Sequence, residues 1–403
     1  MKKLGKPTLL ILLFLALFLV GAFMMQSLQT SLRNTTMILG ADMYPRWVGT
    51  QAVLHRESPY SQATRQQIWL EIYGSSDTPN GNRFGFYYPP AITTLLMPFV
   101  LLGLTGKLAA VFWCAFLFAM LSTALILWST NYRKLPKGLI LIPALLVSGW
   151  LFRPAFSNYL LGQFALFSIL TAIAAWLCFE NDRPIWAGIL ATLSLIKPSL
   201  TIIPIGYLFI KHWRDSKGII TLTASSLLLY LPPTILLGWW LPDFLADISK
   251  YAMENRVAWS IMDVATAPGL FWLLASITLI GLGIYTKNTL LTFGASFALN
   301  AVIAPHSADY DLVSFIPLLA YLGHRYLTEN KSGWLIALFL ILIWFPWFSL
   351  FIILQQVDNN AVEAWYRFIW LVYPSIILLL CVLINFSVIS EMIKKLPGKL
   401  HAR

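Results

Sequence analysis

Long apolar stretches recur along the whole chain, separated by shorter polar segments. Five of them, at residues 8–28, 108–130, 218–240, 334–354 and 369–389, reach the roughly 20 residues that a helix needs to cross a bilayer. Strands of a membrane barrel would instead alternate apolar and polar residues, and these stretches do not. The pattern predicts an all-α polytopic membrane protein.

Further crossings are expected from other apolar stretches. They lie at residues 138–151, 162–179, 185–197, 199–210, 266–286, 288–305 and 312–323. The stretch at 91–104 is too short to cross fully, and we expect it to be interfacial or re-entrant. Together these stretches predict about twelve transmembrane helices in one domain over residues 1–403, without an internal repeat.

Basic residues orient these crossings. They gather in the N-terminal KKLGK, at 131–137, 211–217 and 324–331, and in the tail KKLPGKLHAR. Short basic loops face the cytoplasm, so both termini lie inside. The N-terminus resembles a signal peptide, but we expect it to stay as a first span leading out to a long extracytoplasmic loop at 29–88. The net charge of +11 then fits the cytoplasmic (inner) membrane, not nucleic acid.

Polar residues close to the membrane core are costly and indicate functional sites. The predicted topology gathers such residues on the outer face, where a polar loop is expected at 242–263. They are Asp42, Arg153, Asn158, Gln163, Lys197, His306, Asp309 and Asp311.

Several of these residues have a structural alternative. Asp42 fits a helix N-cap or a solvated acid as well as a base. Arg153 could bind phosphate or extend to the membrane interface. The two prolines after Tyr88 are also typical of a simple helix boundary without a functional role. Lys197 lies before Pro198 in the middle of an apolar stretch, which favours an anion as its partner.

Other chemistry finds little support. His306 and Asp309 can share a helical face, but their spacing matches no metal-binding pattern, and we expect neither a metal nor another cofactor. Cys114, Cys178 and Cys381 lie in apolar stretches, which argues against disulfides. The sequence contains no Walker loop and no GxGxxG, HExxH or GxSxG motif, so nucleotide hydrolysis, dinucleotide redox and serine-hydrolase chemistry are not indicated.

Taken in order, the motifs resemble those of glycosyltransferase family 87. The resemblance runs from about residue 38 to 325. It rests on Asp42 with the later SPY, then YYPP, LLGQFALFSIL, WAGILATLSLIKPSLTIIP before KHWR, and PHSADYDL. It implies a GT-C fold and an inverting transfer of mannose or arabinofuranose from a polyprenyl phosphate outside the cytoplasm; we expect mannose. It also implies that Asp42 is the general base and that His306 contacts the donor phosphate region.

The required chemistry fits these residues. A hydroxyl attacking an anomeric carbon needs a base, and a departing phosphate needs cations or hydrogen-bond donors. We assign the base to Asp42. The donor phosphate is assigned to Lys197, His306, Arg153, Gln163 and Asn158, and shaping of the acceptor site to Tyr88, Asp309 and Asp311.

The expected partners are the lipid-linked donor, a glycolipid or glycan acceptor and the bilayer, without nucleic acid. Two alternatives stay open. Polar residues at span ends also suit a transporter or flippase of a lipid-linked glycan, and an envelope polymer ligase would use a related donor.

The topology can be tested by labelling. Single cysteines introduced beside Asp42 and at Ser307 should react with an impermeant thiol reagent on intact cells. Cysteines at 131–137 and 211–217 should not, because basic loops face the cytoplasm. Labelling of the Asp42 and Ser307 positions from opposite sides of the membrane would contradict a common outer face.

Overall fold

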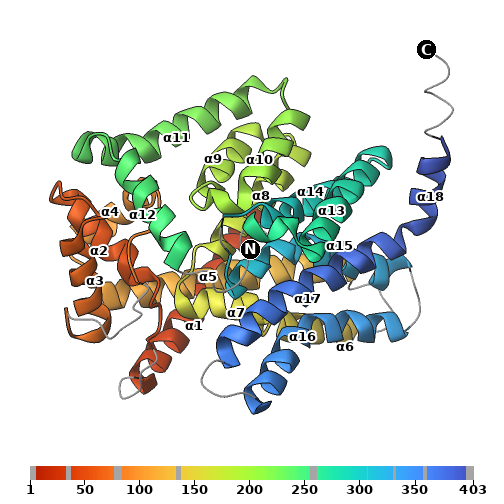
Figure 1. Cartoon of the computed structure of the whole chain (residues 1–403), viewed down its shortest axis with the longest axis horizontal. Coiled ribbons are helices and arrows are strands. Elements are labelled where there is room, and N and C mark those ends of the chain that lie inside the picture. Colours follow the sequence, from red (N-terminus) through yellow and green to blue (C-terminus); the bar gives the residue numbers. More distant parts are fainter. Residues whose placement is uncertain are drawn as a thin grey trace, which may run out of the picture. The chain divides into compact units, whose positions relative to one another are not determined.

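The computed structural model describes residues 6–32, 38–76, 84–132, 138–254, 261–305, 307–329, 333–356 and 361–395. Within these ranges the regular structure is helical, without strands, which confirms the all-α prediction. The chain divides into two compact units, and Figure 1 labels their helices.

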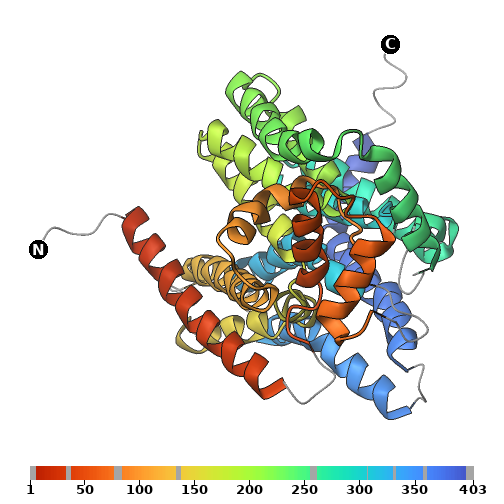
Figure 2. The same ribbon diagram turned by 90° about the vertical axis from the view of Figure 1, so that its left-hand side faces the viewer.

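The first unit contains residues 1–151, 155–197 and 214–255. Its helices are α1 (Lys6–Ser31), α2 (Met43–Leu54), α3 (Gln62–Tyr73), α4 (Ala91–Leu101), α5 (Gly106–Ser129), η2 (Thr130–Tyr132), α6 (Gly138–Trp150), most of α7 (Arg153–Leu161), α8 (Ala165–Glu180), α9 (Pro184–Ser194), α11 (Ser216–Leu237) and α12 (Leu241–Glu254). Helix α1 packs along α5 (Figure 2), and α9 packs against both α8 and α11.

The second unit contains residues 152–154, 198–213 and 256–403. Its elements are α10 (Pro198–Lys211), η3 (Ile261–Ala265), α13 (Ala267–Tyr285), α14 (Thr289–Val302), η4 (Asp309–Phe315), α15 (Ile316–His324), the π-helical turn η5 (Arg325–Glu329), α16 (Gly333–Gln356), α17 (Ala361–Ile384) and α18 (Phe386–Lys395). Helix α14 packs against α10, α13 and α15, while α17 packs against α13 and α16.

Several helices are long and apolar enough to cross a membrane, which supports a multi-pass membrane protein. In the described ranges there are six: α1, α5, α11, α13, α16 and α17. The bent pair α7 and α8 would add a seventh if it forms one broken span. Shorter apolar helices occupy most of the remaining predicted stretches. The count of about twelve crossings stays a prediction.

The short stretch after the paired prolines forms α4, which has 11 residues. At about 1.5 Å of rise per residue, this helix is roughly half as long as the hydrocarbon core is thick. Its length agrees with the expectation that this stretch does not cross fully. The predicted break at Lys197-Pro198 is also present, because α9 ends at Ser194 and α10 begins at Pro198.

The prediction of a polar loop at 242–263 is wrong over its first half. Helix α12 occupies Leu241–Glu254, with apolar side chains at Phe244, Ile248 and Tyr251 spaced three or four residues apart. This spacing gives a short helix one apolar face, while the polar residues between them made the segment look like a loop. The predicted loop at 29–88 likewise contains helices α2 and α3.

Candidate active site

The turn between α7 and α8 organises the first unit. The two helices are bent by 112° relative to each other, and Gly162 between them has a φ of +71°. Glycine adopts this conformation without the steric cost that other residues meet. A Cβ at Gly162 would also lie 3.3 Å from the Cα of Gly40. The turn ends α7 abruptly, so its last carbonyls lose their helical partners.

Those carbonyls bind the segment that follows the first span. The amide of Gly40 donates to the carbonyl of Leu160 at 2.7 Å, and the amide of Asp42 donates to that of Leu161 at 2.9 Å. The carbonyl of Gly162 accepts from the indole of Trp113 at 3.1 Å. Backbone hydrogen bonds therefore fix Asp42 beside the α7–α8 turn.

Asp42 is half-buried and occupies the N-cap position of α2, but its side chain makes no capping hydrogen bond to that helix. Asp42 is therefore an N-cap residue by position, which was the structural alternative to a base, but its carboxylate does not cap the helix. The carboxylate is favoured there because the N-terminus of a helix carries partial positive charge. Burial raises the pKa of Tyr73 at the end of α3, and the charge of Asp42 raises it further, so Tyr73 stays protonated near this acid.

Arg46, one turn into α2, is a central residue that sequence reasoning missed. It is fully buried. Its Nη1 donates to the carbonyl of Asp42 and, at 3.4 Å, to that of Gly162. Its Nη2 donates to the hydroxyl of Tyr88 and, at 3.1 Å, to Oε1 of Gln163. A single cation thus joins α2, the YYPP segment and the α7–α8 turn.

Aromatic rings complete the surroundings of this cation. The guanidinium lies 4.0 Å from the ring centroid of Tyr88 and 4.8 Å from that of Phe164, where the negative face of each ring attracts it. Trp113 stacks on Phe164 at 4.1 Å. The only sequence signal for Arg46 was an arginine in an otherwise apolar stretch, four residues after Asp42.

Three predicted site residues therefore lie around Arg46: Asp42, Tyr88 and Gln163. Asn158, also buried, binds residues on the far end of the α7–α8 turn along the chain. Its Oδ1 accepts from the amide of Leu166 at 2.9 Å, and its carbonyl accepts from the amide of Gln163 at 2.9 Å. These bonds give Asn158 a role in holding the turn, and its assignment to the donor phosphate stays a prediction.

Arg153 and Asp309 form an ion pair in the second unit, with Nη1 and Oδ2 3.3 Å apart. The Arg153 guanidinium also lies 5.3 Å from the rings of Trp347 and of Trp365. Asp311 accepts from the amide of Ala308 at 3.1 Å and so stabilises the start of η4. Arg153 is therefore held by a carboxylate and two rings. His306 lies outside the described residues.

Lys197 is half-buried and lies between α9 and Pro198, the first residue of α10. The structure thus places it at a helix break, as the sequence predicted. Among the residues that the structure describes, no three His, Cys, Asp or Glu side chains cluster closely enough to hold a metal ion.

Arg46 can be tested by a conservative exchange. Arg46→Lys keeps the charge but loses the planar fork that reaches several acceptors at once. Because a hydrogen bond from a charged group contributes about 1.5–3 kcal/mol, we expect a clearly lower midpoint of thermal unfolding in detergent. Arg183→Lys, at an exposed arginine before α9, should melt like the wild type. Equal melting of the Arg46 variant would show that the cation does not hold these elements together.

Comparison with known proteins gives one match. The family model of glycosyltransferase family 87 matches residues 86–320, a segment that includes Tyr88, Asn158, Gln163 and Lys197 and begins after Asp42. No curated protein and no solved structure matches the chain. The matched segment covers more than half of the chain and carries the turn and the YYPP segment that surround Arg46. This membrane protein is therefore a member of glycosyltransferase family 87.

Proposed function

We propose that this glycosyltransferase takes its sugar, mannose, from a polyprenyl-phosphate-linked donor and passes it to a glycolipid or envelope glycan. The reaction occurs on the extracytoplasmic side of the cytoplasmic membrane. The observation that carries the proposal is the placement of Asp42. Its amide donates to the carbonyl of Leu161, and its own carbonyl accepts from Arg46, so its backbone is fixed beside the α7–α8 turn.

The proposed step is a single displacement with inversion. The acceptor hydroxyl attacks the anomeric carbon, and the new C–O bond forms as the bond to the phosphate oxygen breaks. The electron pair of the broken bond leaves with the polyprenyl phosphate, and Asp42 takes the proton of the hydroxyl. A carboxylate on a fixed backbone suits this role because a base must be positioned before the transition state forms.

The leaving phosphate gains negative charge, and a cation beside it lowers the barrier. Lys197 is the candidate in the first unit, because it is half-buried in the break that follows the apolar helix α9. A lysine in such a place interacts with phosphate as a compact point charge. An anionic donor headgroup near the break after α9 would complement this charge.

Asp42→Asn tests the base. The amide keeps the shape of the side chain but cannot take the proton, so we expect the rate of sugar transfer to fall by about a hundred- to ten-thousandfold. Expression, thermal stability and donor binding should stay close to wild type. The measurement is transfer from a radiolabelled polyprenyl-phosphate sugar in reconstituted vesicles.

Matched asparagine variants make this result specific. Asp182→Asn, at an exposed turn between α8 and α9, should transfer sugar like the wild type. Asp309→Asn and Asp311→Asn are the competing candidates. Near-normal transfer by Asp42→Asn together with an inactive Asp309 or Asp311 variant would move the base to the second unit.

Lys197 is tested through the donor. Lys197→Ala should raise the KM for the lipid-linked donor by about tenfold or more, because a charge-assisted hydrogen bond is lost. Lys197→Arg should retain part of the donor use. Lys217→Ala, at an exposed lysine near the start of α11, is the control. Unchanged donor kinetics in the Lys197→Ala variant would remove this residue from the donor site.

A further inference from the structure

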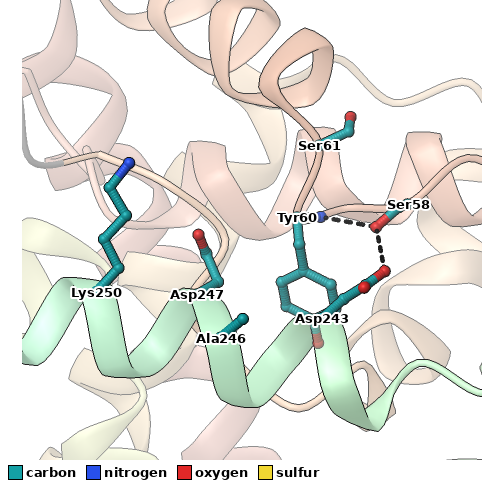
Figure 3. A pocket seen from close by; sticks show the side chains of 7 residues that line it. All are labelled: Ser58, Tyr60, Ser61, Asp243, Ala246, Asp247 and Lys250. Carbon is teal, nitrogen blue, oxygen red and sulfur yellow. Dashed lines mark hydrogen bonds between the residues drawn. The ribbon is translucent and has the colours of Figure 1, made fainter.

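A cavity lies between α12 and the turn that joins α2 to α3, all within the first unit. It is open to the surface, because Asp243, Ala246 and Lys250 are exposed. Its volume is about 430 Å³, and it is lined by Ser58, Tyr60, Ser61, Asp243, Ala246, Asp247 and Lys250. This volume falls in the range of small-ligand sites, about 300–1,000 Å³. Figure 3 shows the α12 side chains facing the Ser58–Ser61 turn. None of these residues belongs to the Asp42–Arg46 cluster.

The spacing along α12 explains how the cavity is lined. Asp243, Asp247 and Lys250 are separated by four and three residues, so they share one face of the helix. Ala246 lies between them and leaves room because its side chain is small. The polar face that made this segment resemble a loop is therefore the wall of a cavity.

Both walls are held in place. Arg65 pairs with Asp247 at 2.5 Å between Nη2 and Oδ1, and their side chains are only 14% and 10% exposed. Ser58 donates to Oδ2 of Asp243 at 3.4 Å. The ring of Tyr87 packs against that of Tyr251 of α12 in a tilted arrangement, with ring centroids 4.1 Å apart. The cavity is thus largely formed before any ligand binds.

Hydrogen bonds connect the cavity to the candidate active site. The Tyr60 hydroxyl donates to the carbonyl of Tyr88 at 2.8 Å, and the Tyr88 hydroxyl accepts from Arg46, which also binds the carbonyl of Asp42. Burial raises the pKa of Tyr60, and the charges of Asp247 and Asp243 raise it further. Tyr60 therefore stays protonated and keeps this connection.

The lining has the chemistry of a site for neutral sugars. Carboxylates accept strong hydrogen bonds from hydroxyl groups, serine hydroxyls both donate and accept, and the Tyr60 ring offers an apolar face. The lining contains two carboxylates, Asp243 and Asp247, and a single cation, Lys250. Arg65 neutralises Asp247, so the pocket holds no excess of positive charge that would favour an anionic ligand over a neutral one. We infer that this cavity binds a neutral hexose unit of the acceptor, an inference that rests on the proposed sugar transfer.

Binding without the donor gives the first test. The full-length protein in lipid nanodiscs would be titrated calorimetrically with the octyl glycosides of glucose, mannose and galactose, and with octyl glucuronide as their anionic counterpart. At least one neutral glycoside should bind, and glucuronide should bind about tenfold more weakly or worse, because like charges repel. Failure of all three neutral glycosides to bind, or equal binding of glucuronide, overturns the inference.

Variants then locate the binding. Asp243→Asn removes one carboxylate charge, and Ala246→Phe fills the cavity without removing a polar group. Each should weaken binding of the neutral glycoside by about tenfold or more. Ser249→Phe introduces the same ring at an exposed position of α12 that does not line the cavity and should bind like the wild type. Unchanged binding in both cavity variants places the glycoside elsewhere and refutes the assignment.

Turnover of the donor separates this inference from the proposed function. Release of sugar from the lipid-linked donor into water requires no acceptor, so this reaction of the wild-type protein tests the use of the donor independently of the cavity. If the donor is turned over but the cavity variants bind glycoside normally, the acceptor site is wrong and the transfer function stands. If the wild type does not use this donor, the proposed function fails, and the titrations still decide what the cavity binds.

Discussion

The sharp end of α7 is the constraint on which the first unit depends. A helix that stops in the apolar interior leaves carbonyls that must find donors, because each unsatisfied buried group is costly. Here the donors are the amides of Gly40 and Asp42 and the indole of Trp113. The cost of breaking a helix is offset by bonds that position the candidate base. Since these bonds use the backbone, the position of Asp42 depends on Gly162 and its φ of +71° more than on the chemistry of neighbouring side chains.

The buried side chain of Arg46 also joins segments of the first unit by hydrogen bonds. Arg46 is fully buried, and a buried charge persists only when several groups compensate for its lost hydration. Its acceptors are two carbonyls, a hydroxyl and an amide oxygen, supplemented by two ring faces. The fork of a guanidinium can serve acceptors in different directions at once, and a lysine cannot. The arrangement stabilises the junction of three chain segments and leaves the carboxylate of Asp42 at the N-terminus of α2.

Sequence reasoning predicted what depends on local composition. Helices long enough to span a membrane, such as α11 and α16, follow from about 20 predominantly apolar residues. The break before Pro198 follows from the chemistry of proline. It missed what depends on distant partners. Arg46 binds Tyr88 and Gln163, which lie 42 and 117 residues further along the chain, so no local pattern marks it as central. Helix α12 was missed for a related reason. Its polar residues face the Ser58–Ser61 turn, which lies far away in the sequence, so the local pattern resembled a loop.

The extent of the family match carries a further consequence. It begins at Phe86, so Asp42, Arg46 and the Ser58–Ser61 turn lie before it, yet each contacts residues inside it. Asp42 binds Leu161 through its amide, Arg46 binds Tyr88 and Gln163, and Tyr60 binds the carbonyl of Tyr88. The matched segment therefore supplies the groups that position Asp42, while the preceding segment contains Asp42 itself. The groups that bind the amides of Gly40 and Asp42 are the backbone carbonyls of Leu160 and Leu161. The bend of the chain at the α7–α8 turn therefore positions this acid, without a particular side chain at either leucine.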